Sequence, residues 1–177
     1  MNTAARQPSR VRVYVPATLA MLQQLVADQM LHARSGTAFA VTPTLRESYA
    51  EGDDEELADV ALREAALASV RLLAGAADEP STGLPPRRAV LVAEVDGATA
   101  RPDLDDAVVR LSGPVTISDA IAAYVDNPTA EQAVLAAIDA IDSADLGDED
   151  AELTVGDAQD HDLAWYATQE IDALLGG

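Results

Sequence analysis

The sequence of 177 residues contains no cysteine and no lysine, and it has only six aromatic residues and ten glycines. Without cysteine there are no disulfides, no thiolate nucleophiles and no thiolate metal sites, and nothing points to an oxidising compartment. Without lysine a Walker-type phosphate loop is excluded, and there is no GxGxxG pattern for a dinucleotide. We therefore expect no cofactor of these classes.

Long apolar runs are also missing. No stretch approaches the roughly 18 uninterrupted apolar residues of a membrane span. The polar start of the chain lacks the apolar core of a signal peptide. We expect a flexible N-terminus over residues 1–10, a single globular domain over 11–177, a cytoplasmic location and no membrane contact.

Basic residues are few, with 11 arginines against 31 acidic residues. All 11 lie within residues 1–110, whereas residues 111–177 carry 15 acidic residues and no basic one. Such a field repels nucleic-acid phosphates and attracts a basic protein or divalent cations. A solvated acidic surface without a partner, a GC-rich genome and a halophilic proteome are the alternatives that remain open.

The first part of the chain alternates strand and helix patterns. Residues 11–15 alternate apolar and polar side chains, as in a strand with one buried face. Thr18 stands where the N-cap of a following helix belongs. A second strand is expected over 38–41, after which Thr44 and Glu47 have the spacing of a capping box.

Three further elements follow. A longer helix is expected over 54–74, because acidic residues fill its first turn and complement the helix dipole. The continuous apolar run 89–95 predicts the central strand of the sheet, covered on both faces. Another strand is expected over 108–111.

The second half of the chain echoes the first. Residues 114–117 and 123–129 resemble the strand-to-helix passages described above, so helices are expected to begin near Thr116 and Thr129. Further along, 153–155 and 163–167 predict a hairpin, after which a last short helix is expected.

The predicted fold class is α/β or α+β, with a mixed sheet of about six strands and helices packed on it. The echo has two interpretations that stay open. One is an internal duplication of a β-α-β-α-β unit over 11–95 and 107–167. The other is the recurrence by chance of ordinary βα-loop chemistry.

Two groups of residues are candidate ligand contacts. In open α/β sheets ligands bind beyond the carboxyl ends of the strands, where helix N-termini offer free N–H groups to a phosphate. The predicted pocket would draw on threonines at these helix starts and on aromatic residues at strand positions, namely Thr18, Thr44, Thr116, Thr129, Tyr14, Tyr124 and Trp165. Core packing is the other interpretation of the aromatic residues.

Four acidic residues are weaker candidates for a metal site. Asp145, Asp148, Asp150 and Glu152 supply oxygen ligands of the kind that Ca²⁺ or Mg²⁺ prefers, but their spacing does not fit an EF-hand, and we expect no metal site.

The two histidines are weak candidates as well. His161, between Asp160 and Asp162, is the one local arrangement that resembles an acid–base set, and a polar turn is the favoured interpretation. His32 is expected near the C-terminal end of the first helix.

Three stretches, 11–19, 40–43 and 165–170, resemble a family of uncharacterised actinobacterial proteins. The resemblance runs over most of the chain from Val11 onward. It implies no activity, cofactor or catalytic residue.

Two functions are carried forward. The first is a non-enzymatic interaction module whose acidic C-terminal half binds a basic protein partner. The alternative is a small-molecule-binding protein or enzyme, for example one that binds a phosphate-containing ligand, with its site at the helix N-termini near the strand carboxyl ends.

Overall fold

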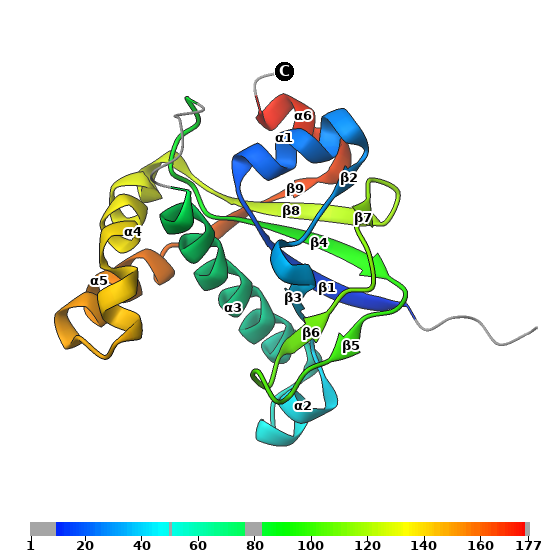
Figure 1. Cartoon of the computed structure of the whole chain (residues 1–177), viewed down its shortest axis with the longest axis horizontal. Helices are drawn as coiled ribbons and strands as arrows, with labels where there is room; N and C mark the ends of the chain where they lie inside the picture. Colours follow the sequence, from blue (N-terminus) through cyan, green and yellow to red (C-terminus); the bar gives the residue numbers. More distant parts are fainter. Residues whose placement is uncertain (1–9, 50, 77–82, 176–177) are drawn as a thin grey trace, which may run out of the picture.

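A seven-stranded sheet forms the centre of the molecule in the computed structural model, which describes residues 10–49, 51–76 and 83–175 (Figure 1). Its order is β5-β6-β3-β1-β4-β8-β9, and every neighbouring pair is antiparallel. The strands are β1 (Val11–Ala17), β3 (Thr37–Phe39), β4 (Ala89–Val95), β5 (Thr99–Ala100), β6 (Val108–Arg110), β8 (Ala120–Asp126) and β9 (Leu163–Ala167). A separate small sheet pairs β2 (Met30–Leu31) with β7 (Val115–Thr116).

Six α-helices accompany the sheets in the described residues. They are α1 (Leu19–Asp28), α2 (Pro43–Ser48), α3 (Asp54–Gly75), α4 (Glu131–Asp145), α5 (Glu149–Gln159) and α6 (Ile171–Leu174). The predicted class, helices packed on a sheet, is confirmed as α+β. The sheet is antiparallel throughout, rather than mixed in strand direction.

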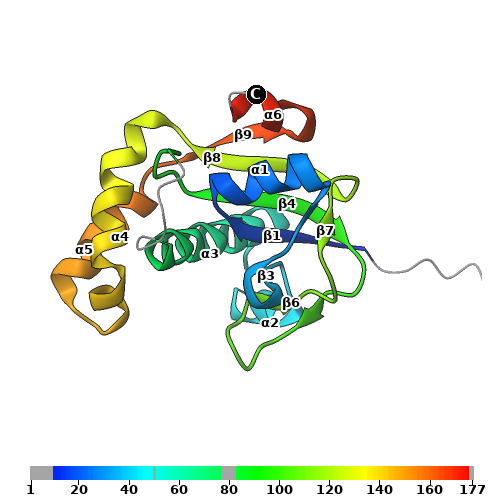
Figure 2. The same cartoon turned by 45° about the horizontal axis from the view of Figure 1, so that its top comes forward.

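The strands β1 and β4 lie inside the sheet and are covered on both faces. Val15 and Leu91 point into a core with α1 and α6, whereas Tyr14 and Val90 point into a core with α3. Figure 2 draws α1 and α3 on opposite sides of β1. The continuous apolar run of β4 therefore has the meaning predicted for a central strand.

The long helix α3 begins where the sequence predicts it. Asp53 accepts a hydrogen bond from the Glu56 N–H at 2.9 Å, and the Glu56 side chain faces back to the Asp53 N–H in a capping box. The buried residues Leu57, Ala61 and Ala65 lie at i, i+4 and i+8, so one face of α3 packs on the sheet.

The helices α4 and α5 form a hairpin at one end of the sheet (Figure 1). Their shared core holds Val134, Ile141, Val155 and Ala158, and Val70 of α3 joins it. Residues 153–155, predicted as half of a β-hairpin, lie inside α5 instead. The strand prediction was wrong because packing of Val155 and its helical neighbours against α4 outweighs local β-propensity.

The second half does not repeat the element order of the first. β7 passes to β8 through a turn, so the helix predicted at Thr116 is absent. The two β-α-β-α-β halves are therefore not found in this arrangement, and a duplication of 11–95 and 107–167 stays a prediction about ancestry.

The predicted flexible N-terminus lies outside the described residues, except for its last member. Arg10 donates a hydrogen bond to Asp119 Oδ1 at 2.9 Å and also bonds to the Glu94 carbonyl, which ties it to the end of the sheet. None of the helices in the described part of the chain combines the length and the apolar character that a bilayer crossing requires.

Candidate functional site

The three aromatic candidates lie on the face of the sheet that carries α3. Tyr124 in β8 is directly opposite Trp165 in β9, so their side chains share this face. Tyr14 packs beneath α3 and is 8% exposed, whereas Trp165 is 56% exposed. Burial, more than any nearby charge, raises the pKa of the Tyr14 phenol above its ordinary value. Tyr14 is thus a core residue, and Trp165 is accessible to a partner.

The first two threonine candidates differ in their roles. Thr18 is the N-cap of α1, because its Oγ1 accepts a hydrogen bond from the Met21 N–H at 3.2 Å. The cap of α2 is Thr42, whose Oγ1 accepts from the Leu45 N–H at 3.0 Å. Thr44 lies inside α2, so the predicted capping box is two residues out of place.

The other two threonines do not cap a helix. Thr116 lies in β7, and Thr129 lies in a 3-10 turn ahead of α4 with no capping hydrogen bond. Because β1 and β3 are antiparallel, Thr18 and Thr44 follow strands that end at opposite ends of the sheet. The structure therefore does not bring the four threonines together at one sheet edge.

A buried ion pair, which the sequence analysis did not identify, joins β8 to the residue just before β4. Arg88 donates to Asp126 through Nε at 2.9 Å and through Nη2 at 2.7 Å, and the Arg88 N–H also reaches Asp126 Oδ2 at 2.8 Å. Both side chains are almost completely buried. Such a bidentate pair satisfies the carboxylate and fixes the guanidinium plane.

The same guanidinium holds the connection between α5 and β9. Arg88 Nη1 donates to Gln159 Oε1 at 3.0 Å, and Nη2 donates to the His161 carbonyl at 2.8 Å. A hollow of about 100 Å³ beside this cluster is lined on its α3 side by Asp59 and Arg63. Its small volume and its partnered Arg88 indicate a structural cluster rather than a ligand pocket.

The two histidines take different places from those expected of catalytic or dipole-facing groups. His161 lies in the turn before β9 and contributes its backbone carbonyl to Arg88. His32 follows β2 and not a helix end, because α1 already stops at Asp28. It lines a separate surface hollow of about 210 Å³ that includes Ser112.

Two of the four metal candidates have structural partners. Asp145 accepts two hydrogen bonds from Arg71, at 3.0 and 2.8 Å, which bind α4 to α3. Asp148 is the N-cap of α5 and accepts from the Ala151 N–H at 2.9 Å. Asp150 and Glu152 lie in the first turn of α5. Across the described ranges, no group of three or more acidic or histidine side chains is placed to hold a metal ion.

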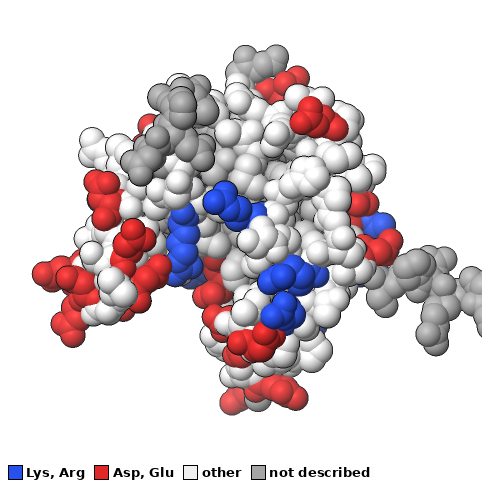
Figure 3. All heavy atoms as spheres, in the orientation of Figure 1, with Lys and Arg blue, Asp and Glu red and all other residues white. Residues whose placement is uncertain are grey.

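The hairpin of α4 and α5 combines acidity with exposed apolar side chains. Residues 131–160 hold ten Asp or Glu residues and no basic residue. Leu135, Leu146 and Leu153 are 51%, 90% and 71% exposed, so three large apolar side chains of this hairpin face solvent. In Figure 3 acidic side chains gather over the end of the molecule where Figure 1 places this hairpin.

Four exposed side chains of α4 and its C-cap residue form one stripe. Leu135, Asp139, Asp142 and Leu146 follow one another at i, i+4, i+7 and i+11, and all are exposed. The opposite stripe, with Val134, packs inward. This mixed acidic and apolar face is the main candidate site, and only the structure separates it from the buried face.

Comparison with known proteins gives one result. The sequence model of DUF6912, a family of unknown function, matches residues 11–175. No curated protein and no solved structure matches the chain.

Proposed function

Because the chain belongs to the family of unknown function DUF6912, whose description supplies no activity, we propose from its geometry that it is a non-enzymatic interaction module. Its α4–α5 hairpin binds a basic amphipathic helix of a protein partner. The observation that carries this proposal is the coincidence of exposed leucines with unpaired carboxylates on one helical hairpin.

The carboxylates of the hairpin fall into two sets. Glu131, Asp145 and Asp148 are bonded to Arg87, Arg71 and the α5 backbone, so they hold the hairpin in place. The other seven have no side-chain hydrogen bond or ion pair within the described residues, and they are Asp139, Asp142, Glu149, Asp150, Glu152, Asp157 and Asp160. This second set is available to lysine or arginine residues of a partner, which it also attracts over a distance.

The exposed leucines supply the part of the binding free energy that charge does not. Covering a leucine side chain completely is worth about 1.5–3 kcal/mol, whereas an exposed ion pair is worth about 0–1 kcal/mol. Leu146 and Leu153 are the most exposed of the three. A partner whose apolar side chains cover these leucines, with its basic residues over the carboxylates of the hairpin, matches the hairpin in both respects.

Several contacts fix the hairpin in position on the rest of the protein. Arg71 and Arg87 anchor α4 at opposite ends, and Arg63 Nη1 donates to the Gln159 carbonyl at the end of α5. Since its apolar face already packs against α3, the exposed face remains for another molecule.

The proposal is tested with a synthetic peptide of about 16 residues, long enough for four helical turns, that carries a stripe of Leu flanked on both sides by Arg. We expect the double variant Leu146→Ser/Leu153→Ser to bind this peptide about tenfold more weakly in fluorescence anisotropy, because both apolar anchors are lost. Added salt weakens the binding to the unchanged protein.

The control variant is Leu104→Ser, which changes a leucine that is 51% exposed in a loop outside the hairpin. It is expected to bind like the unchanged protein. Equal affinity of all three proteins, or equal binding of a peptide with Glu in place of Arg, would show that the hairpin is not the site.

The proposal includes a cytoplasmic location and an actinobacterial origin. The absence of cysteine supports the first, and the use of arginine in place of lysine, typical of a GC-rich genome, supports the second.

A further inference from the structure

The edge strand β9 is a second unpartnered feature of the acidic half. β9 pairs with β8 on one side, and no strand pairs with its other side in the described residues. The opposite edge of the sheet is the two-residue strand β5, which is too short to accept another strand. β9 has five residues. It contains no charged residue and no proline, and these are the residues that usually prevent an edge strand from pairing with another chain.

Backbone geometry shows which groups of β9 are free. The Asp126 N–H donates to the Arg88 carbonyl at 3.1 Å, so the backbone of Asp126 faces the β4 side. The backbone N–H and C=O groups of its neighbour Val125 therefore point toward β9, where Val125 pairs with Ala164. By the same alternation, the backbone groups of Leu163 and Trp165 point away from β8.

A second contact agrees with this orientation. The Ala167 N–H, which also points away from β8 by the alternation, donates to the Glu170 side chain at 2.8 Å. The outward N–H and C=O groups of Leu163 and Trp165 have no hydrogen-bond partner in the described part of the chain. They form a ready template for main-chain pairing with an extended peptide.

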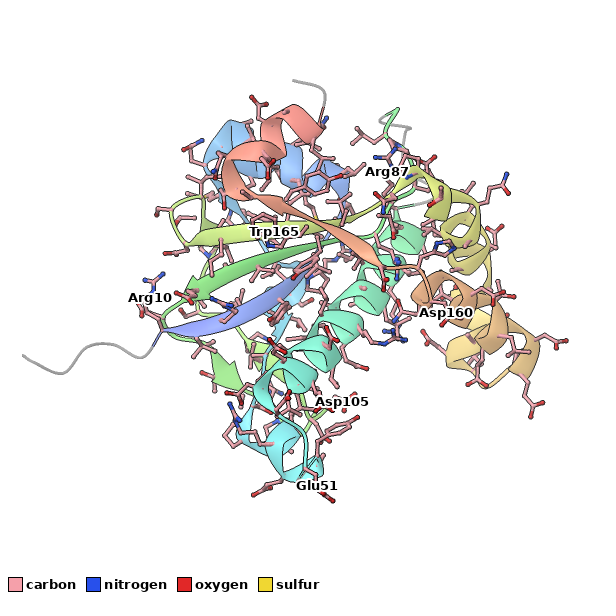
Figure 4. All side chains as sticks on the ribbon, turned by 180° about the vertical axis from the view of Figure 1, so that it is seen from behind. Arg10, Glu51, Arg87, Asp105, Asp160 and Trp165 are labelled. Carbon is pink, nitrogen blue, oxygen red and sulfur yellow. The ribbon has the colours of Figure 1, made fainter. Side chains whose placement is uncertain are left out.

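Trp165 adds a side-chain anchor to this edge. It is 56% exposed and lies beside Tyr124. Figure 4 shows no helix in front of β9 at the position labelled Trp165. An added strand would place a side chain next to Trp165 on the same face. Tryptophans that are buried on binding are often among the residues that contribute most to the binding free energy.

The charges at the two ends of β9 indicate the kind of peptide. Asp162 precedes the strand, and Glu170 and Asp172 follow it, all exposed and without an ion pair in the described residues. A peptide with an uncharged centre and basic residues at both ends would place its positive charges next to the carboxylates at the two ends of β9. A second copy of this chain would instead bring further carboxylates toward these same groups.

From these observations we infer that β9 is a docking edge for an extended peptide segment with basic ends. This site is separate from the α4–α5 hairpin and takes a partner segment of different conformation. The inference does not rest on the hairpin proposal.

The test uses the one tryptophan of the chain, Trp165, as its own reporter. The probe is a synthetic peptide of about nine residues, with a Val, Thr and Tyr centre and two arginines at each end. Binding at β9 is expected to shift the tryptophan emission of the full chain to shorter wavelength, with saturation. The same peptide with alternate amides N-methylated on the pairing edge should bind at least about tenfold more weakly, because it cannot donate to the strand.

Three outcomes would overturn the inference. Equal binding of the N-methylated peptide would mean attraction by charge alone. An emission shift with protein concentration, without any peptide, would mean that a second copy covers the edge. No shift at millimolar peptide would mean that β9 binds no such segment.

A matched variant separates the two proposals. Leu146→Ser/Leu153→Ser should leave the tryptophan response to the extended peptide unchanged, while it weakens binding of the helical peptide. If the double variant abolished both responses, β9 would not be an independent site.

Discussion

Arg88 and Asp126 form the contact on which we expect the fold to depend most at the scale of single residues. Asp126→Asn leaves the Arg88 guanidinium buried without its charge partner, so we expect a loss of about 3–5 kcal/mol in the free energy of unfolding. Urea denaturation at neutral pH measures this loss.

The matched control is Glu94→Gln, which breaks the exposed ion pair of Glu94 with Arg12 at 3.1 Å. It should cost less than about 1 kcal/mol, since water and salt screen such a pair. The double change Arg88→Met/Asp126→Leu removes both charges and should recover much of the loss. If Asp126→Asn cost no more than Glu94→Gln, the buried pair would not be as the structure shows it.

At the scale of elements, the attachment of α4 to α3 depends on pH through Asp145. The hydrogen bonds from Arg71 hold the pKa of this carboxyl below its ordinary value. A lowered pKa in the folded state adds stability above the ordinary pKa near 3.8, and this stability is lost as the pH falls through the folded value. Asp145→Asn should therefore cost up to about 1 kcal/mol at pH 7, because both side chains are partly exposed.

The pH dependence distinguishes this pair from general acidity. The difference between Asp145→Asn and the unchanged chain should shrink on acidification toward about pH 3, as urea unfolding at a series of pH values measures. Asp162→Asn, at an exposed carboxyl outside the helices and strands and with no ion pair in the described residues, is the control and should show no such pattern. A constant difference at every pH would contradict the role of the Arg71 contact.

At the scale of the whole molecule, the net charge of −20 opposes compaction. Added sodium chloride screens this repulsion, since the Debye length falls from about 30 Å at 0.01 M to about 3 Å at 1 M. We expect a stabilisation on the order of 1 kcal/mol across this range, which for a chain of this size raises Tm by about 2–4 °C. Differential scanning calorimetry at several salt concentrations measures the shift.

The variant Asp139→Asn/Asp142→Asn tests the cause. It removes two exposed negative charges of α4, of which Asp142 lies in the last turn, where negative charge is unfavourable. Its Tm should be higher at low salt and should respond less to added salt. An unchanged salt response would point to a general salting-out effect instead.

The sequence by itself determined the elements with a strong local pattern. The alternation at 11–15 predicted β1, the apolar run predicted β4, and the acidic first turn predicted α3. Thr18 was also identified correctly as a cap. These signals succeed because side-chain periodicity and capping act between residues close in sequence.

Tertiary structure alone decided the rest. Strand direction placed Thr18 and Thr44 at opposite ends of the sheet, and packing on α4 made residues 153–155 helical. Arg88 and Asp126 are 38 residues apart, and their pairing depends on the register of β4 with β8. Whether a leucine or a tryptophan is buried likewise depends on which elements cover it, so the exposed Leu146 and Trp165 could not be distinguished from core residues by local pattern.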